Sequence, residues 1–204
     1  MLAWAVLPAF FRVRVLGRQH LPGDCGILVV CNHQSYADPV LLGLALRRKV
    51  SFMARQSLFR MAPFRWLIRS LNAFAVRPGE PDLAAAREAV ARLRAGEVVC
   101  LFPEGTRTRD GGIGHFRPGF VMIAARAGVP IVPAAIEGAF AAWPRHCRFP
   151  MPGWVWVAFG KPVAVADGDV SAGPRRAELG ERIRGEVERL QHCLRQRRAL
   201  GRRF

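Results

Sequence analysis

The sequence predicts an α/β fold with a mixed, largely parallel sheet flanked by helices. Short apolar runs that suit buried strands, such as "ILVVC" at residues 27–31 and "VVCLF" at residues 98–102, alternate along the chain with segments of helical periodicity. The chain has 204 residues, of which 51% are hydrophobic. This is enough for one substantial core, so we expect a single domain over residues 1–204.

The first half of the chain contains three predicted strands and two predicted helices. Residues 27–31 form the first strand, and "PVLLGLALRR" at residues 39–48 forms a helix, with Asp38 as its expected N-cap and Pro39 at its first position. Residues 50–54 and 73–76 are short strands that flank one or two helical turns. A second helix is expected at residues 82–94, where apolar side chains recur every three or four residues until Gly96.

The second half continues the alternation. Residues 98–102 form a second buried strand, and a helix from residue 118 to residue 127 ends at Gly128. Strands follow at residues 131–136 and 155–159. The last element, residues 175–198, is a long basic helix with one apolar face, made of Leu179, Ile183, Val187 and Leu190. Parallel strands in this order place a functional site beyond their carboxyl ends.

The composition is strongly basic. Lys and Arg number 31 against 15 Asp and Glu, which gives a formal net charge of +16. Such a charge attracts anions, including nucleic acid, anionic lipid headgroups and phosphorylated substrates, although a GC-rich genome also favours arginine. The five cysteines show no metal-binding or CxxC spacing, which suggests reduced thiols in a cytosolic compartment.

Two segments suggest contact with a membrane surface rather than a span. No stretch reaches the roughly 18 apolar residues that a spanning helix needs, and the apolar start of the chain lacks the features of a signal peptide. We therefore expect residues 1–16 to be a membrane-associated segment. Residues 51–70 mix aromatic residues with arginines, as suits a headgroup boundary, although an ordinary core with a solvated basic face explains the same pattern.

A histidine and an aspartate directly follow the first buried strand, in "NHQSYADP". Pro39 disfavours the α region at Asp38, so residues 33–38 are expected to form a loop that can bring the side chains of His33 and Asp38 together. A hydrogen bond between them would fix the tautomer of His33 and leave one ring nitrogen free as a base. The alternative is that Asp38 only caps the helix.

Further polar residues follow other strands. "FPEGTRTRDG" begins at Phe102, where the second buried strand ends, and Arg107 in this loop could bind a phosphate with both guanidinium branches. Arg77 ends the strand candidate "LNAFAVR". Each arginine alone is more often a surface charge than a ligand.

Taken together, these stretches resemble the glycerolipid acyltransferases of the lysophosphatidate acyltransferase type. From residue 17 to residue 160 the chain contains, in that family's order, "GRQHLP", "NHQSYADP", "LNAFAVR", "FPEGTRTRDG", "FRPG" and "VPIVPAAIEG". The resemblance implies the fold of that family and transfer of an acyl group from acyl-CoA or acyl carrier protein to a lysophospholipid hydroxyl. The usual product of that family is phosphatidate, made from 1-acylglycerol 3-phosphate.

The resemblance also implies roles for individual residues. His33 would be the general base and Asp38 its partner, and Arg107, with Arg77, would bind the glycerol phosphate. The expected substrate-binding residues are Arg77, Glu104, Gly105, Thr106, Arg107 and Arg117. No metal or cofactor is implied, because acyl-CoA or acyl carrier protein serves as a co-substrate.

The chemistry of an acyl transfer suits these residue types. An alcohol that attacks a thioester must lose its proton, and a positioned imidazole can accept it without a covalent enzyme intermediate. The chain has no GxSxG motif, so a serine hydrolase is not supported. Backbone amides near His33 or Glu104, or the side chain of Arg117, are the alternative donors to the oxyanion.

The chain departs from the family pattern at two positions. Asn72 stands where glycine is common, which has little effect if Asn72 adopts the left-handed conformation. Arg117 replaces a common lysine, which keeps the charge but changes its geometry.

Three functions are compatible with the sequence. The first is acyl transfer to lysophosphatidate by a peripheral enzyme at the cytoplasmic face of the cell membrane, with residues 17–160 as the motif-bearing core. The second is the same chemistry on another acceptor, such as a lyso-ornithine lipid or other lysophospholipid. The third is nucleic-acid binding by the basic helix within residues 174–204, which explains the charge but none of the motifs. We therefore expect no nucleic-acid partner.

Overall fold

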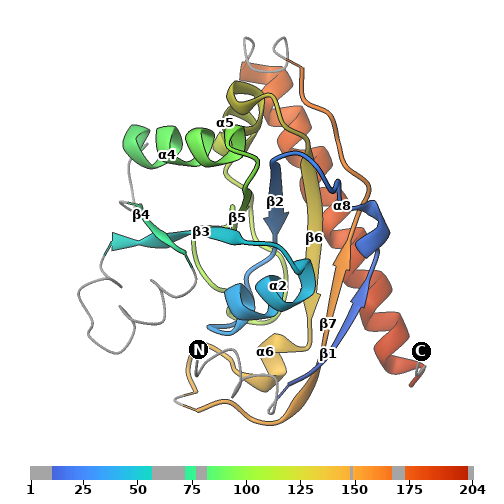
Figure 1. Cartoon of the computed structure of the whole chain (residues 1–204). Helices are drawn as coiled ribbons and strands as arrows, with labels where there is room; N and C mark the ends of the chain where they lie inside the picture. The colour runs from blue at the N-terminus through green and yellow to red at the C-terminus, as the bar shows by residue number, and fades with distance from the viewer. Residues whose placement is uncertain (1–10, 57–71, 77–81, 148, 167–172, 202–204) are drawn as a thin grey trace.

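The fold is built around a mixed, seven-stranded sheet (Figure 1). A computed structural model describes residues 11–56, 72–76, 82–147, 149–166 and 173–201. The strand order is β1-β7-β6-β2-β5-β3-β4. The strands are β1 (Phe11–Leu16), β2 (Ile27–Cys31), β3 (Val50–Arg55), β4 (Phe74–Val76), β5 (Val98–Leu101), β6 (Ile131–Glu137) and β7 (Gly153–Phe159). The helices are η1 (Arg18–His20), α2 (Asp38–Leu46), α4 (Leu83–Arg94), α5 (Gly119–Ala127), α6 (Ala139–Ala142) and α8 (Gly173–Ala199).

Five neighbouring strands run in the same direction. The central strand β2 pairs in parallel with β5 on one side and β6 on the other, and β3 and β4 extend the parallel part beyond β5. Strand β7 is antiparallel to β6, and β1 is parallel to β7. The prediction of a mixed, largely parallel sheet is confirmed. We call the edge at which β2 to β6 end the carboxyl edge; β1 and β7 begin there.

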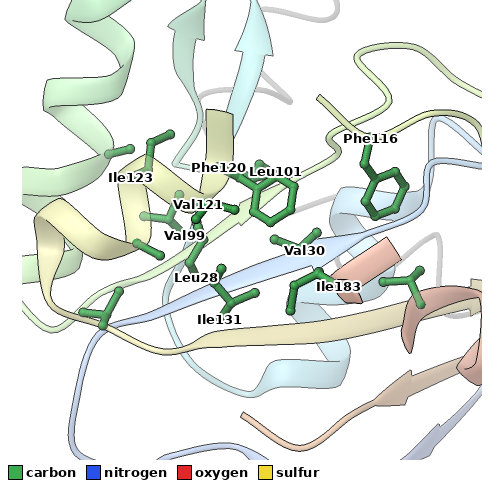
Figure 2. Packing of buried hydrophobic residues seen from close by; sticks show 14 of the residues in the cluster. Leu28, Val30, Val99, Leu101, Phe116, Phe120, Val121, Ile123, Ile131 and Ile183 are labelled. Atoms are coloured by element: carbon green, nitrogen blue, oxygen red, sulfur yellow. The ribbon is translucent and has the colours of Figure 1, made fainter. Parts of the chain in front are cut away.

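The sheet is covered on both faces, which explains why β2 is apolar at every position. Ile27 and Val29 face the layer that contains α2 and α6, whereas Leu28 and Val30 face the layer that contains α4, α5 and α8. In the second layer, shown in Figure 2, these side chains of β2 lie among those of the neighbouring strands and of α5 and α8. Strands buried on both faces are typical of parallel sheets with helical crossovers.

The described part of the chain starts with a strand. Of residues 1–16, for which membrane association stays a prediction, residues 11–16 belong to the sheet as the edge strand β1 and pair with β7 along its whole length. The physical reason is the alternation in "FRVRVL", where Phe11, Val13 and Val15 pack against one buried layer and the arginines occupy the positions between them. Residues 1–10 lie outside the described residues.

The segment of mixed aromatic residues and arginines, residues 51–70, is only partly described. Its first residues belong to β3, where Phe52 is buried in the core. For those residues the alternative of an ordinary core is correct. Residues 57–71 lie outside the described part. In the ranges that are described, no helix combines the length and the hydropathy needed to cross a membrane.

Candidate active site

The loop after β2 brings His33 and Asp38 together. His33 Nδ1 lies 2.8 Å from Asp38 Oδ2, and the Asp38 side chain is fully buried while that of His33 is 20% exposed. An ionised carboxylate only accepts hydrogen bonds, so Nδ1 donates to Asp38 and Nε2 keeps its lone pair. Within the described ranges Nε2 has no hydrogen-bond partner. The predicted contact between these two residues is confirmed.

The same carboxylate oxygen of Asp38 organises the loop. Oδ2 also accepts hydrogen bonds from the backbone amides of Gln34 (2.6 Å) and Ser35 (2.8 Å). The expected N-cap role is wrong: α2 begins at Asp38 itself, its N-cap is Ala37, and no side chain caps it. The reason is that the carboxylate turns back towards the preceding loop, whose amide groups it binds.

Asn32 fixes the point where β2 ends. Its amide oxygen accepts from Ile136 N (2.8 Å) and its Nδ2 donates to Ile136 O (3.0 Å), so the side chain continues the pairing of β2 with β6. Asn32 is fully buried. It therefore sets the position of the next residue, His33, relative to the sheet.

Glu104 connects His33 to the loop that follows β5. Its Oε1 accepts from His33 N (2.9 Å) and its Oε2 from Gly114 N (3.0 Å). Burial raises the pKa of Glu104 above its ordinary value, although both amide hydrogen bonds oppose that shift. The backbone oxygen of His33 accepts from Thr108 N (2.8 Å) in the same loop. The backbone of His33 is therefore held from both sides.

The ring of His33 is held as well. It stacks on the ring of Phe102, with centroids 4.1 Å apart and an interplanar angle of 15°. Because Phe102 directly follows β5 and His33 follows β2 closely, neighbouring parallel strands bring the two rings together at the carboxyl edge.

Arg107 lies beside the same loop. Its guanidinium carbon is 3.3 Å from the centroid of the Tyr36 ring, a cation–π arrangement. Its Nη1 atom is buried and has no hydrogen-bond partner among the residues that the structure describes. A buried guanidinium nitrogen without a partner is costly, so this group is suited to binding an anion.

Comparison with known proteins identifies the family. The sequence model of the acyltransferase family matches residues 12–137, which include His33, Asp38, Glu104 and Arg107. The chain belongs to the acyltransferase family.

Individual acyltransferases support this assignment. The chain is 27% identical over 184 residues to the 1-acyl-sn-glycerol-3-phosphate acyltransferase of Bacillus subtilis, which covers 89% of each protein. It is 28% identical over 176 residues to a chloroplast 1-acyl-sn-glycerol-3-phosphate acyltransferase of Arabidopsis thaliana, and that match covers 84% of this chain but 49% of the relative. The crystal structure of the 1-acyl-sn-glycerophosphate acyltransferase of Thermotoga maritima superimposes with a TM-score of 0.75 at 32% identity, covering 91% of this chain and 73% of that one.

The other predicted binding residues of this acyltransferase border the same loops. Gly105 has a φ of 68°, and a Cβ atom at that position would lie 3.9 Å from the Arg117 guanidinium carbon. Thr106 and Arg117 are exposed, and Arg117 N donates to Pro103 O (3.1 Å). Arg77 lies outside the described residues.

Asn72 conforms to its prediction. Its φ of 53° is in the left-handed region, as expected for a residue that replaces glycine. Its Nδ2 donates to Ser51 Oγ (2.7 Å), so the turn into β4 is also held by a side-chain hydrogen bond.

Sequence reasoning missed Asn32 and Gln34, which flank His33. Both are buried polar side chains. The available signal was their position in a polar run directly after an apolar strand, but the sequence gives no indication of their partners on β6 and beyond.

Proposed function

We propose that this acyltransferase moves a fatty acyl group from acyl-CoA or acyl carrier protein to the sn-2 hydroxyl of 1-acylglycerol 3-phosphate, giving phosphatidate. The observation that carries the proposal is the buried Asp38 carboxylate 2.8 Å from His33 Nδ1, which leaves Nε2 free at the carboxyl edge. The relatives from Bacillus subtilis and Thermotoga maritima are named for transfer to this acceptor, which supports the choice.

The proposed step uses His33 as base and then as acid. Nε2 accepts the proton of the acceptor hydroxyl while its oxygen forms a bond to the thioester carbonyl carbon. The tetrahedral intermediate then loses the thiolate, which takes the proton from the imidazolium. Asp38 stabilises the imidazolium between the two events, and positioned bases of this kind contribute about 10²–10⁴-fold. The reaction needs no cofactor.

Arg107 is proposed to bind the acceptor phosphate. Stacking on Tyr36 holds the guanidinium plane, and its buried Nη1 has a free donor for a phosphate oxygen. Arg77 and Arg117 are proposed to contribute further positive charge, while Glu104, Gly105 and Thr106 shape the loop beside the acceptor. An acceptor without a phosphomonoester, such as a lyso-ornithine lipid, would not require Arg107.

The test is acyl transfer from labelled acyl-CoA and acyl carrier protein to lysophosphatidate in detergent or vesicles. His33→Ala should abolish transfer in a folded protein. Arg107→Ala should mainly raise the KM for lysophosphatidate. Arg109→Ala is the matched control, because Arg109 is an exposed arginine of the same loop.

Two results would contradict the proposal. Transfer by His33→Ala at the wild-type rate would reject His33 as the base. If acceptors without a phosphomonoester react as fast as lysophosphatidate, the phosphate role of Arg107 and the proposed acceptor are both wrong.

We further propose that the enzyme works as a peripheral protein at the cytoplasmic face of the cell membrane. Three large apolar residues are exposed near the start of β7, namely Phe149 (72%), Met151 (53%) and Trp154 (37%). The guanidinium groups of Arg12 and Arg14 each lie 5.2 Å from the Trp154 ring centroid. Aromatic and basic side chains in such mixtures suit an anionic headgroup region.

The sheet topology supports a membrane-facing position for these exposed residues. Because β7 and β1 begin at the carboxyl edge, the exposed residues lie at the end of the sheet that carries His33. The five cysteines are all free thiols, which is in keeping with a reducing compartment.

Binding to vesicles tests the membrane proposal. The double substitution Phe149→Ser and Met151→Ser should weaken co-sedimentation with vesicles of phosphatidylcholine and phosphatidylglycerol, whereas Leu83→Ser, at a residue 61% exposed in α4, should not. Unchanged co-sedimentation of the double variant would reject this surface. A loss of activity only with acyl carrier protein as donor would assign the surface to that protein instead.

A further inference from the structure

A polar network with a buried centre connects the C-terminal helix to the active-site loops, and its two arginines, Arg195 and Arg198, are 48% and 44% exposed. Its centre is Glu137, the last residue of β6, which is 8% exposed. Glu137 Oε2 accepts from Gln191 Nε2 (3.0 Å) and Arg195 Nε (3.0 Å), both on α8. Arg198 Nη1 lies 3.5 Å from the other carboxylate oxygen. Helix α8 therefore donates several hydrogen bonds to the end of a strand at the carboxyl edge.

Gln191 and Arg195 of α8 also bind the loop that contains Arg107. The backbone oxygen of Gly111 accepts from Gln191 Nε2 (3.0 Å) and from Arg195 Nη2 (2.7 Å). Thr108, which lies between Arg107 and Gly111, donates its backbone N–H to His33 O and accepts from Gly111 N through its hydroxyl (3.1 Å). A displacement of Gly111 would therefore be transmitted to the backbone of His33.

The network also reaches the residue after His33. The side chain of Gln34 is buried, and its Nε2 is 3.3 Å from both Glu137 Oε2 and Gly111 O. Its Oε1 accepts from Phe140 N (3.2 Å). The backbone N–H of the same residue donates to Asp38 Oδ2. Gln34 thus connects Glu137 and Gly111, which α8 holds, to the Asp38 carboxylate that orients His33.

We propose that Gln191 and Arg195 of α8 are positioning residues for acyl transfer. They hold Glu137 and Gly111, and through them Gln34 and the Arg107 loop, in the arrangement that His33 and Asp38 require. The inference rests on the proposed role of His33. It goes beyond the family assignment, because the matched family region ends at residue 137 and α8 lies outside it.

The attachment of α8 to the sheet does not depend on this network. Five apolar side chains of the helix are buried against the sheet and α5, namely Leu179, Ile183, Val187, Leu190 and Leu194. Burial of apolar side chains of this size is a main source of folding stability. The ion pair of Glu137 with Arg195 adds little net stability because the arginine is 48% exposed, whereas a hydrogen-bonded network favours one geometry over others. Precise loop geometry is what a general base needs.

Two variants test the proposal. Arg195→Met and Gln191→Leu keep the approximate side-chain volume and remove the hydrogen bonds to Glu137 and Gly111. Arg189→Ala is the matched control, because Arg189 is an exposed arginine of α8 whose ion pair is with Glu186 on the same helix. All kinetics are measured well below the melting temperature of each full-length variant, so that unfolding does not contribute.

Kinetics and the state of His33 are the two readouts. For Arg195→Met and Gln191→Leu we expect kcat/KM to fall about 10–100-fold. We also expect the ¹⁵N resonances of His33, assigned with His33→Gln, to change from a single Nδ1–H tautomer to a mixture. Arg195→Lys should recover part of both properties, and Arg189→Ala should match the wild type.

The His33 resonances separate the positioning role from the proposed acceptor. If both variants keep wild-type kinetics and wild-type His33 resonances, even with lower melting temperatures, the network is only structural and the proposal is overturned. If the wild type does not use lysophosphatidate but the variants change the His33 resonances, the proposed acceptor is wrong and the positioning role stands.

Discussion

Asp38→Asn is the substitution that most directly tests how the site works. The wild-type carboxylate places three hydrogen bonds on Oδ2, from His33 Nδ1 and from the backbone amides of Gln34 and Ser35. An asparagine oxygen in the same place can still accept from both amides, so the loop should keep its shape. The neutral amide, however, no longer stabilises an imidazolium, and its oxygen accepts from Nδ1–H more weakly than a carboxylate does.

This geometry sets the size of two expected losses, one in kcat and one in stability. In Ser-His-Asp enzymes the equivalent change lowers kcat about 10⁴-fold. His33 is additionally held by Phe102 and Glu104, so we expect a loss in kcat of about 10²–10⁴-fold, or roughly 2.7–5.4 kcal/mol at 1.36 kcal/mol per tenfold. Because Asp38 Oδ1 is buried and has no partner in the described part of the chain, the new NH₂ group is left unsatisfied there, which costs about 1–3 kcal/mol of stability.

The assay is steady-state acyl transfer with urea unfolding measured in parallel. Asp110→Asn is the control, because Asp110 is an exposed aspartate of the nearby loop that bonds Thr108 and Gly112. If Asp38→Asn keeps more than about a tenth of the wild-type kcat while His33→Ala is inactive, the imidazole works without orientation by Asp38, and our reasoning fails.

Three further predictions follow from single contacts. Phe102→Leu removes the ring that stacks on His33. Because an aromatic pair contributes about 0.5–1.5 kcal/mol, kcat should fall about 2–10-fold in the transfer assay. An unchanged kcat would show that the stack has no catalytic effect. Gly138→Ala should lower the free energy of unfolding by about 1–3 kcal/mol, because the residue has a φ of 93° and its Cβ would lie 2.3 Å from Trp154 O. Gly119→Ala is the control in the same denaturation experiment, because a Cβ atom at that position would have nothing within 4 Å. Burial acts to raise the pKa of Glu97, but the hydrogen bonds from Ser51 and Lys49 together with the positive charges of Lys49 and Arg92 lower it overall. A depressed pKa contributes stability that is present above the ordinary value of about 4.3 and is lost as the pH falls below it. The difference in melting temperature between the wild type and Glu97→Gln should therefore shrink on acidification, and a constant difference from pH 7 to pH 3 would contradict this explanation.

Local sequence patterns predicted most of the elements. Runs such as "ILVVC" are apolar at every position because both faces of a central strand are buried, and β2 and β5 lie where these runs predict. The helix at residues 82–94 starts as expected, with the Asp82 side chain accepting from Ala85 N. Strand β1 was missed because its period-2 pattern is short and follows an apolar stretch, and strand pairing depends on a partner, β7, that lies far along the chain.

The contact between His33 and Asp38 was predictable for a similar reason. His33 and Asp38 are five residues apart in a loop whose shape is restricted by Pro39, so their contact is largely local. The N-cap prediction for Asp38 failed because its carboxylate accepts from the backbone amides of Gln34 and Ser35 in the preceding loop, and this arrangement exists only in the folded loop.

The sequence by itself determined the order of most strands and helices and the residue types that the proposed base and phosphate-binding group require. Only the tertiary structure decided the partners of Asn32, Gln34 and Glu104, and it alone joined Arg195 to the active-site loops. The physical reason is that helical and strand periodicity depend on neighbours a few residues away. Hydrogen bonds between residues 71 to 104 positions apart, such as those of Glu104 and Asn32, depend on which strand ends meet at one edge of the sheet.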